Sequence, residues 1–288
     1  MNIINYRDVA VNDYGIFLLN ESYNDYRNTI LLIPGFLNEV KDSYGLDSVS
    51  NQVFQSRWKS NWVRRFSDKN TLNRYNVFIA SWPSSTLNNM VYSLFDPRLQ
   101  DPSLNNCWEM IKVAVNDPFR GFVSEPLRRA RESWRNTVEE SEKFVSVVEE
   151  FLDEINSRTI VISHSLGARI ALRVFEKSGN HKKSLDRFYV ALAPMICHSE
   201  LETDSLLISY MAQLDLFYSK NDFVLNHLYP EGQRAEDYVL GYEGAPKESR
   251  LSECCIDSKR GHLDYEEDVI TILRNSRAWN RFNTSETL

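Results

Sequence analysis

Thr159-Ile-Val-Ile-Ser-His-Ser-Leu-Gly-Ala-Arg-Ile-Ala171 is the stretch around which the rest of the chain is organised. It opens with an apolar, β-branched run at residues 160–162, which is typical of a buried strand. After a sharp turn at residues 163–167, the apolar residues follow helical spacing. A strand, a tight turn and a helix with a serine at the apex is the arrangement that lifts a serine hydroxyl above the end of a sheet. The first N–H groups of such a helix point at the same place, where a developing oxyanion would sit.

The motif for this kind of turn is G-x-S-x-G, and the chain has Ser163-His-Ser-Leu-Gly167. The first glycine is replaced by serine, which is still small enough for a position where strand and helix pack closely. The alternative is an ordinary buried strand followed by a helix that begins with a serine cap. The five residues leave both interpretations open, so the rest of the chain has to decide between them.

Length and composition indicate a globular protein with no bias towards nucleic acid. The chain has 288 residues, of which 42% are hydrophobic and 25% charged, enough for a sizeable core. A net charge of −7 argues against non-specific nucleic-acid binding, which needs a basic face. The first residues lack the pattern of a signal peptide, and no apolar run is long enough to span a membrane. We therefore expect a cytoplasmic protein.

Cysteines and histidines give no sign of a metal site. The four cysteines, Cys107, Cys197, Cys254 and Cys255, contain no C-x-x-C spacing, and adjacent cysteines rarely form a structural disulfide. The histidines are too scattered for a zinc site. The simplest interpretation is reduced thiols in the cytoplasm, with no metal and no cofactor.

Apolar runs separated by helical patterns predict the fold class. The predicted strands are residues 29–33, 75–82, 160–162, 187–193 and 214–222, with a hairpin at 9–20. Three of these strands stop at a proline: Pro34, Pro83 and Pro194. Amphipathic helices are predicted at residues 57–67, 137–155 and 266–282 and directly after the serine turn. The alternation predicts an α/β fold, with a mostly parallel central sheet and helices on both faces.

We expect one domain over residues 1–288. Residues 84–136 carry no strand pattern, only short helical pieces separated by prolines, so they are predicted to be a helical insertion before the nucleophile strand. This region is either lid-like or a set of extra helices packed on one face of the sheet. Residues 39–56 and 230–253 are predicted to be loops.

Three residues form a candidate catalytic set. Ser165 comes first, Asp222 follows at the end of a late strand, and His262 lies in a loop before the last helix. This chain order is one of several in which serine, acid and histidine are used together. A serine hydroxyl is a poor nucleophile unless a base takes its proton, and imidazole suits that role near neutral pH. A carboxylate keeps the imidazole in the correct tautomer.

Each of these residues has rivals. Asp222 lies in a turn-rich segment and could simply form a turn, while Asp215 lies inside the same strand and Asp257 lies close to His262. Asp222 is preferred because it lies at a strand end. His262 is preferred among the histidines because it follows a glycine and precedes the terminal helix; the others are His164, His181, His198 and His227.

Backbone and apolar groups complete the candidate site. The backbone N–H of Leu166, directly after the serine, and that of Phe36, after Pro34-Gly35, are the candidate oxyanion donors. Trp82 and His164 are candidate substrate contacts, and Trp82, Phe36 and parts of residues 84–136 could line an apolar acyl pocket. Aromatic residues are more often part of a core than of a pocket.

With these motifs in place, the chain resembles the α/β-hydrolase-fold serine hydrolases over about residues 28–280. The matching segments are Ile33-Pro-Gly-Phe-Leu37 for the oxyanion loop, Ser163-His-Ser-Leu-Gly-Ala168 for the elbow, Tyr218-Ser-Lys-Asn-Asp222 for the acid turn, and Arg260-Gly-His-Leu-Asp-Tyr265 for the histidine loop. Pro34-Gly35 stands where a His-Gly pair is common, and Ser163 replaces the first elbow glycine. Neither change removes a catalytic group.

Within that superfamily, two segments are similar to a branch that includes transmembrane and coiled-coil domain-containing protein four. They are Ser-Leu-Gly-Ala-Arg-Ile170 and Pro-Gly-Phe-Leu37. The membrane segments of that branch are absent here. The resemblance implies a serine hydrolase acting on a small acyl ester or a lipid through an acyl-enzyme. Two alternatives remain: an amidase or peptidase with the same triad, and a hydrolase-like fold that only binds or scaffolds. The oligomeric state is left open.

Overall fold

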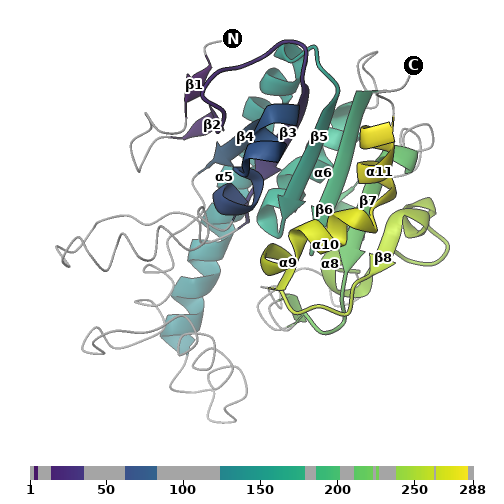
Figure 1. Cartoon of the computed structure of the whole chain (residues 1–288). Coiled ribbons are helices and arrows are strands. Elements are labelled where there is room, and N and C mark those ends of the chain that lie inside the picture. The colour runs from purple at the N-terminus through teal and green to yellow at the C-terminus, as the bar shows by residue number, and fades with distance from the viewer. Residues whose placement is uncertain are drawn as a thin grey trace.

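The computed structural model describes residues 3–5, 14–35, 62–82, 124–178, 186–201, 211–222, 225–226, 238–262 and 264–284. Figure 1 shows a central twisted sheet with helices on both sides. Residues 36–61 and 83–123 lie outside the described residues. They contain Phe36, the predicted loop at 39–56, the start of the predicted helix at 57–67 and most of the predicted insertion.

One eight-stranded sheet organises the described residues, in the order β1-β2-β4-β3-β5-β6-β7-β8. Its strands are β1 (Ile4–Asn5), β2 (Gly15–Leu18), β3 (Asn28–Ile33), β4 (Tyr75–Ser81), β5 (Thr159–His164), β6 (Arg187–Leu192), β7 (Leu214–Tyr218) and β8 (Cys255–Asp257). Only the β2–β4 pair is antiparallel. Because the neighbours of β5 are parallel to it, their carboxyl ends meet at one edge with Ser165.

The central strands are apolar because both of their faces are covered. Every residue of β4, β5 and β6 is buried. Helices α5 (Ser124–Glu154) and α6 (Leu166–Ser178) lie on one face, and α10 (Val269–Arg274) and α11 (Arg277–Thr284) lie on the other (Figure 1). A parallel strand between two helical layers has no polar side, which is why the sequence shows continuous apolar runs.

Three features make this an α/β-hydrolase fold. They are the order of the strands, the antiparallel pairing of β2 with β4 near one edge of the sheet, and the turn at Ser165 after β5. The predicted fold class is therefore confirmed. Within the described residues, no helix is both long and apolar enough to cross a bilayer.

Two helix predictions have the wrong extent. The sequence predicts a helix at 137–155 that follows the insertion, but α5 runs without a break through 31 residues, and it includes the end of the predicted insertion. Conversely, the predicted final helix at 266–282 is divided into α9 (Asp264–Glu267), α10 and α11. At the break before α11, the Ser276 hydroxyl accepts from the Trp279 N–H as a helix cap and donates to the buried Asp215 carboxylate.

The two ends of the sheet also differ from prediction. The first arm of the predicted 9–20 hairpin lies outside the described residues, and the second arm forms β2, whose edges pair with β1 and β4. The edge strands β1 and β8 and helix α2 (Lys69–Arg74) were missed. Strands of two or three residues are too short for an alternating pattern to emerge. The predicted loop 230–253 contains α8 (Leu240–Glu243) and begins the 3-10 helix η6 (Arg250–Cys254).

Candidate active site

Ser165 occupies the single-residue turn between β5 and α6 and has the backbone conformation that such a turn demands. Its φ angle is 55°, in the left-handed region that costs a non-glycine residue of order 1–3 kcal/mol. Its N–H donates to the carbonyl of Leu192 at the end of β6, at 2.9 Å. Its own carbonyl accepts from the N–H groups of Ala168 and Arg169 in the first turn of α6. Strand and helix therefore hold the serine at the carboxyl edge of the sheet.

Two glycines are required by the closeness of the turn to the end of β3. A Cβ on Gly167 would lie 2.3 Å from the Ile33 carbonyl oxygen, and one on Gly35 would lie 2.7 Å from the Cβ of Ser165. Ser163, which replaces the first glycine of the motif, fits because it is buried and its hydroxyl donates to the Val190 carbonyl at 3.2 Å. The departure from the motif is accommodated by one hydrogen bond.

Ser165, His262 and Asp222 form a continuous hydrogen-bonded chain. His262 Nε2 lies 3.0 Å from Ser165 Oγ, and His262 Nδ1 lies 2.7 Å from Asp222 Oδ2. The carboxylate can only accept, so Nδ1 carries the hydrogen and Nε2 is left to accept from the serine hydroxyl. All three residues are buried, which strengthens each electrostatic contact.

The two rival acids lie elsewhere. Asp215 is buried inside β7 and accepts hydrogen bonds from Ser276 and from the N–H of Ala278, at the start of α11. Asp257 is exposed at the end of β8, where it accepts from the N–H of Lys259. The second oxygen of Asp222 accepts from the N–H of Leu225 at 2.9 Å, which fixes the carboxylate plane. Only Asp222 among the three contacts His262.

The buried Tyr265 links the segment after His262 to the end of β7 through Ser258. Tyr265 shares a hydrogen bond with Ser258, and the Ser258 hydroxyl also reaches the carbonyl of Tyr218 at the end of β7. Burial raises the pKa of Tyr265 far above its ordinary value, and the nearby Asp222 charge raises it further while the Ser258 hydrogen bond opposes them. The phenol therefore stays neutral, with the Ser258 hydroxyl as its hydrogen-bond partner.

The predicted backbone donors are only partly described. Leu166 is the first residue of α6, so its N–H is among those that a helix leaves without an intrahelical partner. Phe36 lies outside the described residues. The predicted substrate contact Trp82 is buried, and its indole N–H donates to the Pro34 carbonyl at 2.9 Å. That contact makes Trp82 a support for the segment that leads to Phe36.

His164, the other predicted substrate contact, is only 1% exposed. Its Nε2 lies 3.0 Å from the carbonyl oxygen of His262, and the two imidazole rings pack with centroids 4.7 Å apart. The structure thus places His164 against the backbone of His262. Its contact with a substrate stays a prediction.

Sequence reasoning missed Met195. Its N–H donates to the Ser165 carbonyl at 3.2 Å, and its sulfur lies 3.8 Å from Ser165 Oγ. It follows Ala193, which has a φ of 45°, and Pro194, so the chain turns back sharply after β6. The proline that ends the strand is visible in the sequence, but no local signal shows that the next side chain reaches Ser165.

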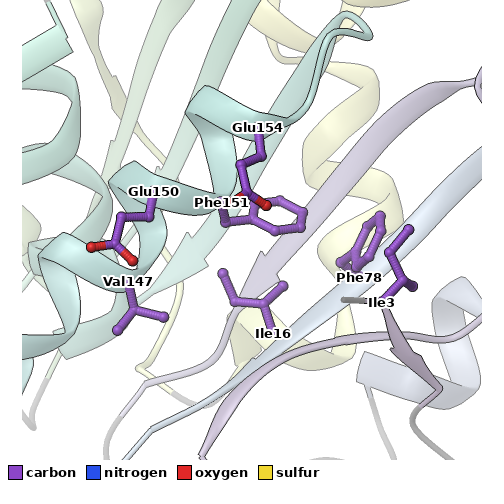
Figure 2. Close-up of a pocket in the computed structure, with 7 residues that line it drawn as sticks. All are labelled: Ile3, Ile16, Phe78, Val147, Glu150, Phe151 and Glu154. Carbon is purple, nitrogen blue, oxygen red and sulfur yellow. The ribbon is translucent and has the colours of Figure 1, made fainter. Parts of the chain in front are cut away.

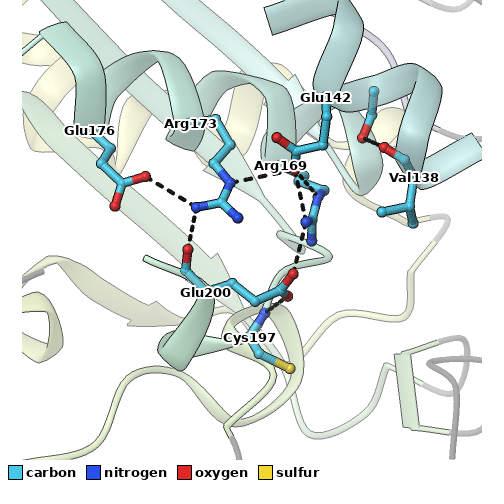
Figure 3. Close-up of polar contacts among 8 residues, drawn as sticks. Val138, Glu142, Arg169, Arg173, Glu176, Cys197 and Glu200 are labelled. Carbon is cyan, nitrogen blue, oxygen red and sulfur yellow. Dashed lines mark hydrogen bonds and ion pairs between the residues drawn. The ribbon is translucent and has the colours of Figure 1, made fainter. Parts of the chain in front are cut away.

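An ion-pair cluster holds the segment that carries Met195 (Figure 3). Arg169 of α6, with a side chain 6% exposed, pairs with Glu142 of α5 at 2.8 Å and with Glu200 at 2.7 Å. Glu200 in turn accepts from the N–H of Cys197 at 2.8 Å. Arg173, one turn further along α6, pairs with Glu142 and Glu176. The cluster connects α5, α6 and the segment after β6.

A shallow cleft lies between α5 and the amino-terminal edge of the sheet (Figure 2). It has a volume of about 220 Å³ and is lined by Ile3, Ile16, Phe78, Val147, Glu150, Phe151 and Glu154. Strands β4 and β3 separate β2 from β5 in the sheet. The cleft therefore belongs to a different part of the molecule from Ser165. Within the described part of the chain, no group of three or more His, Cys, Asp or Glu side chains could hold a metal ion.

Comparisons with known proteins give structural likeness only. No family model matches the chain, and no curated protein sequence matches it. Among solved structures it is similar to a YdeN-like hydrolase from Pectobacterium atrosepticum, with a TM-score of 0.37, 14% identity, and coverage of 87% of this chain and 91% of that one. It is also similar to acyl-protein thioesterase 2 from Zea mays, with a TM-score of 0.40, 15% identity, and coverage of 92% and 100%. At such scores the fold assignment rests on the strand order and the serine turn.

Proposed function

We propose that the protein is a serine hydrolase that cleaves an ester or a related acyl bond through Ser165, His262 and Asp222. The observation that carries the proposal is the unbroken chain of hydrogen bonds from Ser165 Oγ to the Asp222 carboxylate, at 3.0 Å and 2.7 Å. A structural serine has no need of a buried imidazole in the acceptor tautomer at hydrogen-bond distance. An activated nucleophile requires one.

The contacts support the following reaction. Ser165 Oγ attacks the carbonyl carbon of the acyl bond while His262 Nε2 takes the hydroxyl proton. Asp222 holds the Nδ1–H and stabilises the imidazolium that forms. The tetrahedral intermediate collapses, the leaving group takes the proton from His262, and an acyl-serine remains. Water, deprotonated by the same imidazole, then attacks the acyl carbon. This second intermediate breaks its bond to Ser165 Oγ, which takes the proton back from His262, and the carboxylic acid leaves.

The negative charge on the carbonyl oxygen would be stabilised by backbone donors. Leu166 at the start of α6 supplies one N–H, and the helix dipole adds to it. The second donor in this proposal is the N–H of Phe36. Its neighbour Gly35 lies against Ser165, which brings this segment to the reacting edge.

The proposal is tested by labelling the purified protein with a fluorophosphonate, which forms a stable bond only with an activated serine. We expect stoichiometric labelling of the wild type and none of Ser165→Ala or His262→Ala, with all three proteins folded by circular dichroism. A screen of acyl esters by chain length would follow. Asp257→Asn is a matched control, because that exposed carboxylate accepts a hydrogen bond from the N–H of Lys259 rather than one from His262.

A folded wild-type protein that resists labelling at any probe concentration would overturn the proposal. It would favour the interpretation in which this fold serves binding alone. Labelling at another residue, with Ser165→Ala labelled as fast as the wild type, would equally contradict the assignment of the nucleophile.

A further inference from the structure

The histidine next to the nucleophile holds the backbone of the histidine that contacts the nucleophile. A carbonyl oxygen can only accept, so His164 Nε2 carries a hydrogen and donates it to the His262 carbonyl at 3.0 Å. The two imidazole rings pack with centroids 4.7 Å apart, and the ring centroid of Tyr265 lies 6.0 Å from that of His164. The buried His164 ring thus packs against two other rings.

This contact acts on a different part of His262 from the two side-chain contacts. Nδ1 and Nε2 set the orientation of the imidazole ring through Asp222 and Ser165. The carbonyl contact instead sets the position of the backbone from which the ring extends. The loop has little regular structure of its own, because it lies between β8 and α9 and includes Lys259 with a φ of 55°.

The donor is also covalently coupled to the nucleophile. His164 is the last residue of β5, and Ser165 follows it directly. A backbone shift at the end of β5 would move both the serine hydroxyl and the donor that holds the His262 loop. Both partners of the Ser165–His262 hydrogen bond are therefore positioned by the same two consecutive residues, the last residue of β5 and the turn that follows it.

We propose that His164 is a positioning residue, which keeps the His262 imidazole at hydrogen-bond distance from Ser165 by holding the His262 carbonyl. This inference rests on the proposed hydrolase function for its kinetic consequence, but the hydrogen bond itself exists independently of turnover. Misplacement of a catalytic group by about 1 Å lowers a rate by up to about 100-fold. Loss of the donor should therefore lower kcat by about 10-fold to 100-fold and change KM by less than about twofold, since a buried side chain does not contact substrate.

The test compares three substitutions that separate the ring from the hydrogen bond. His164→Phe keeps a ring and removes the donor, and His164→Asn keeps an amide that is too short to reach the carbonyl. His164→Gln places an amide N–H at about the reach of Nε2. We expect kcat and the fluorophosphonate labelling rate to fall in the Phe and Asn variants and to be restored substantially in the Gln variant. If His164→Phe fails to fold, the Asn and Gln pair decides the result.

A second readout does not need catalysis. The Nδ1 proton of His262, hydrogen-bonded to Asp222, gives a far-downfield proton NMR signal that His262→Ala identifies by its loss. We expect this signal to broaden in His164→Phe and His164→Asn, as the loop loosens, and to stay sharp in His164→Gln. His198→Phe is the matched control, because His198 Nε2 lies 3.0 Å from the hydroxyl of Ser249 and not against His262. This substitution should change neither readout.

The outcomes separate the two proposals. An unlabelled wild type whose downfield signal nevertheless responds to His164 as described would contradict the hydrolase and keep the positioning contact. A labelled wild type whose rate and signal are the same in the Phe and Asn variants would overturn the role of His164 and leave the hydrolase standing. Equal loss in the Gln and Asn variants would also overturn it, because a requirement for the ring alone is a packing effect.

Discussion

Two aspartates of the β7 region are equally buried and do different things. Asp215 and Asp222 are both 0% exposed, and seven positions separate them in the chain. Asp215 lies inside β7 and uses its oxygens to hold the start of α11, through Ser276, Arg277 and the N–H of Ala278. Asp222 lies beyond the strand end and divides its oxygens between Leu225 and His262.

The difference shows that burial alone does not identify a functional carboxylate. Among the described residues, the donors to Asp215 lie at the start of α11, so its charge stabilises this helix end and the helix dipole. Asp222 instead contacts a group that can change its protonation state. A carboxylate at the carboxyl edge of the sheet can reach a loop from another part of the chain, whereas one inside a strand faces only the helix packed on it.

The largest expected effect is on turnover. Asp222→Asn should lower kcat by about 10⁴-fold, because the amide N–H would face Nδ1 and force His262 into the tautomer that cannot accept from Ser165. Asp215→Asn should keep its turnover within about threefold of wild type at a temperature where it is folded. Steady-state kinetics on the best ester found in the screen measures both. Full activity in Asp222→Asn would refute the assignment of the acid.

On stability the order of the two variants reverses. Asp215→Asn should lower the free energy of unfolding by about 2 kcal/mol, because its amide keeps accepting from Ser276 and Ala278 only by turning its donor hydrogens towards Arg277, so the contact with Arg277 is lost. Asp222→Asn should change it by less than about 1 kcal/mol, since the Leu225 N–H and a retautomerised His262 both remain satisfied. Urea unfolding of the three proteins decides. Equal destabilisation would mean that the two carboxylates do not differ as proposed.

Raising the pH should lower the free energy of unfolding through Cys254, a buried thiol near Asp215. Burial raises the pKa of the Cys254 thiol from 9.0 to about 12, the nearby Arg277 opposes this, and Asp215 adds to it. Between these two values the unfolded state has lost the proton that the folded state keeps, so stability present below pH 9.0 falls by about 1.4 kcal/mol per pH unit. Urea unfolding at pH 8, 9 and 10 should show a smaller slope for Cys254→Ala. A slope identical to wild type would contradict this origin.

The smallest effect concerns an exposed carboxylate that caps a helix from within its own segment. Asp68 accepts from the N–H groups of Asn70 and Thr71 at the start of α2, and hydrogen bonding from Thr71 is the main cause that lowers its pKa. Asp68→Ala should lower stability by about 1 kcal/mol at neutral pH.

This contribution is present above the unfolded pKa of about 3.9 and is lost as pH falls through the lower folded value. The wild type and Asp68→Ala should therefore converge in acid-range thermal melts. A difference that persists down to pH 2 would show that the loss is not due to the charged cap. Asp215 and Asp68 both accept hydrogen bonds at the start of a helix. The larger loss of stability expected for Asp215 reflects its burial.

Much of the sheet could be predicted because its strands are buried on both sides. The runs predicted at 29–33, 75–82 and 187–193 correspond to β3, β4 and β6 to within one residue at either end. The final helix was predicted without its break, because Asn275 and Ser276 are also found within helices; here Ser276 caps α11 by accepting from the Trp279 N–H, and its hydroxyl donates to the buried Asp215. The roles of His164 and Met195 had no local signal, because both depend on segments distant in the chain.

The sequence by itself determined the fold class, the serine turn and the order in which Ser165, Asp222 and His262 follow one another. Those features depend on local periodicity, on small residues at a tight turn and on strand breaks, all of which act within a few residues. Only the tertiary structure decided which aspartate contacts His262 and which side chain holds its backbone. The physical reason is that these contacts join the ends of separate strands, and the packing of the sheet alone brings those ends together.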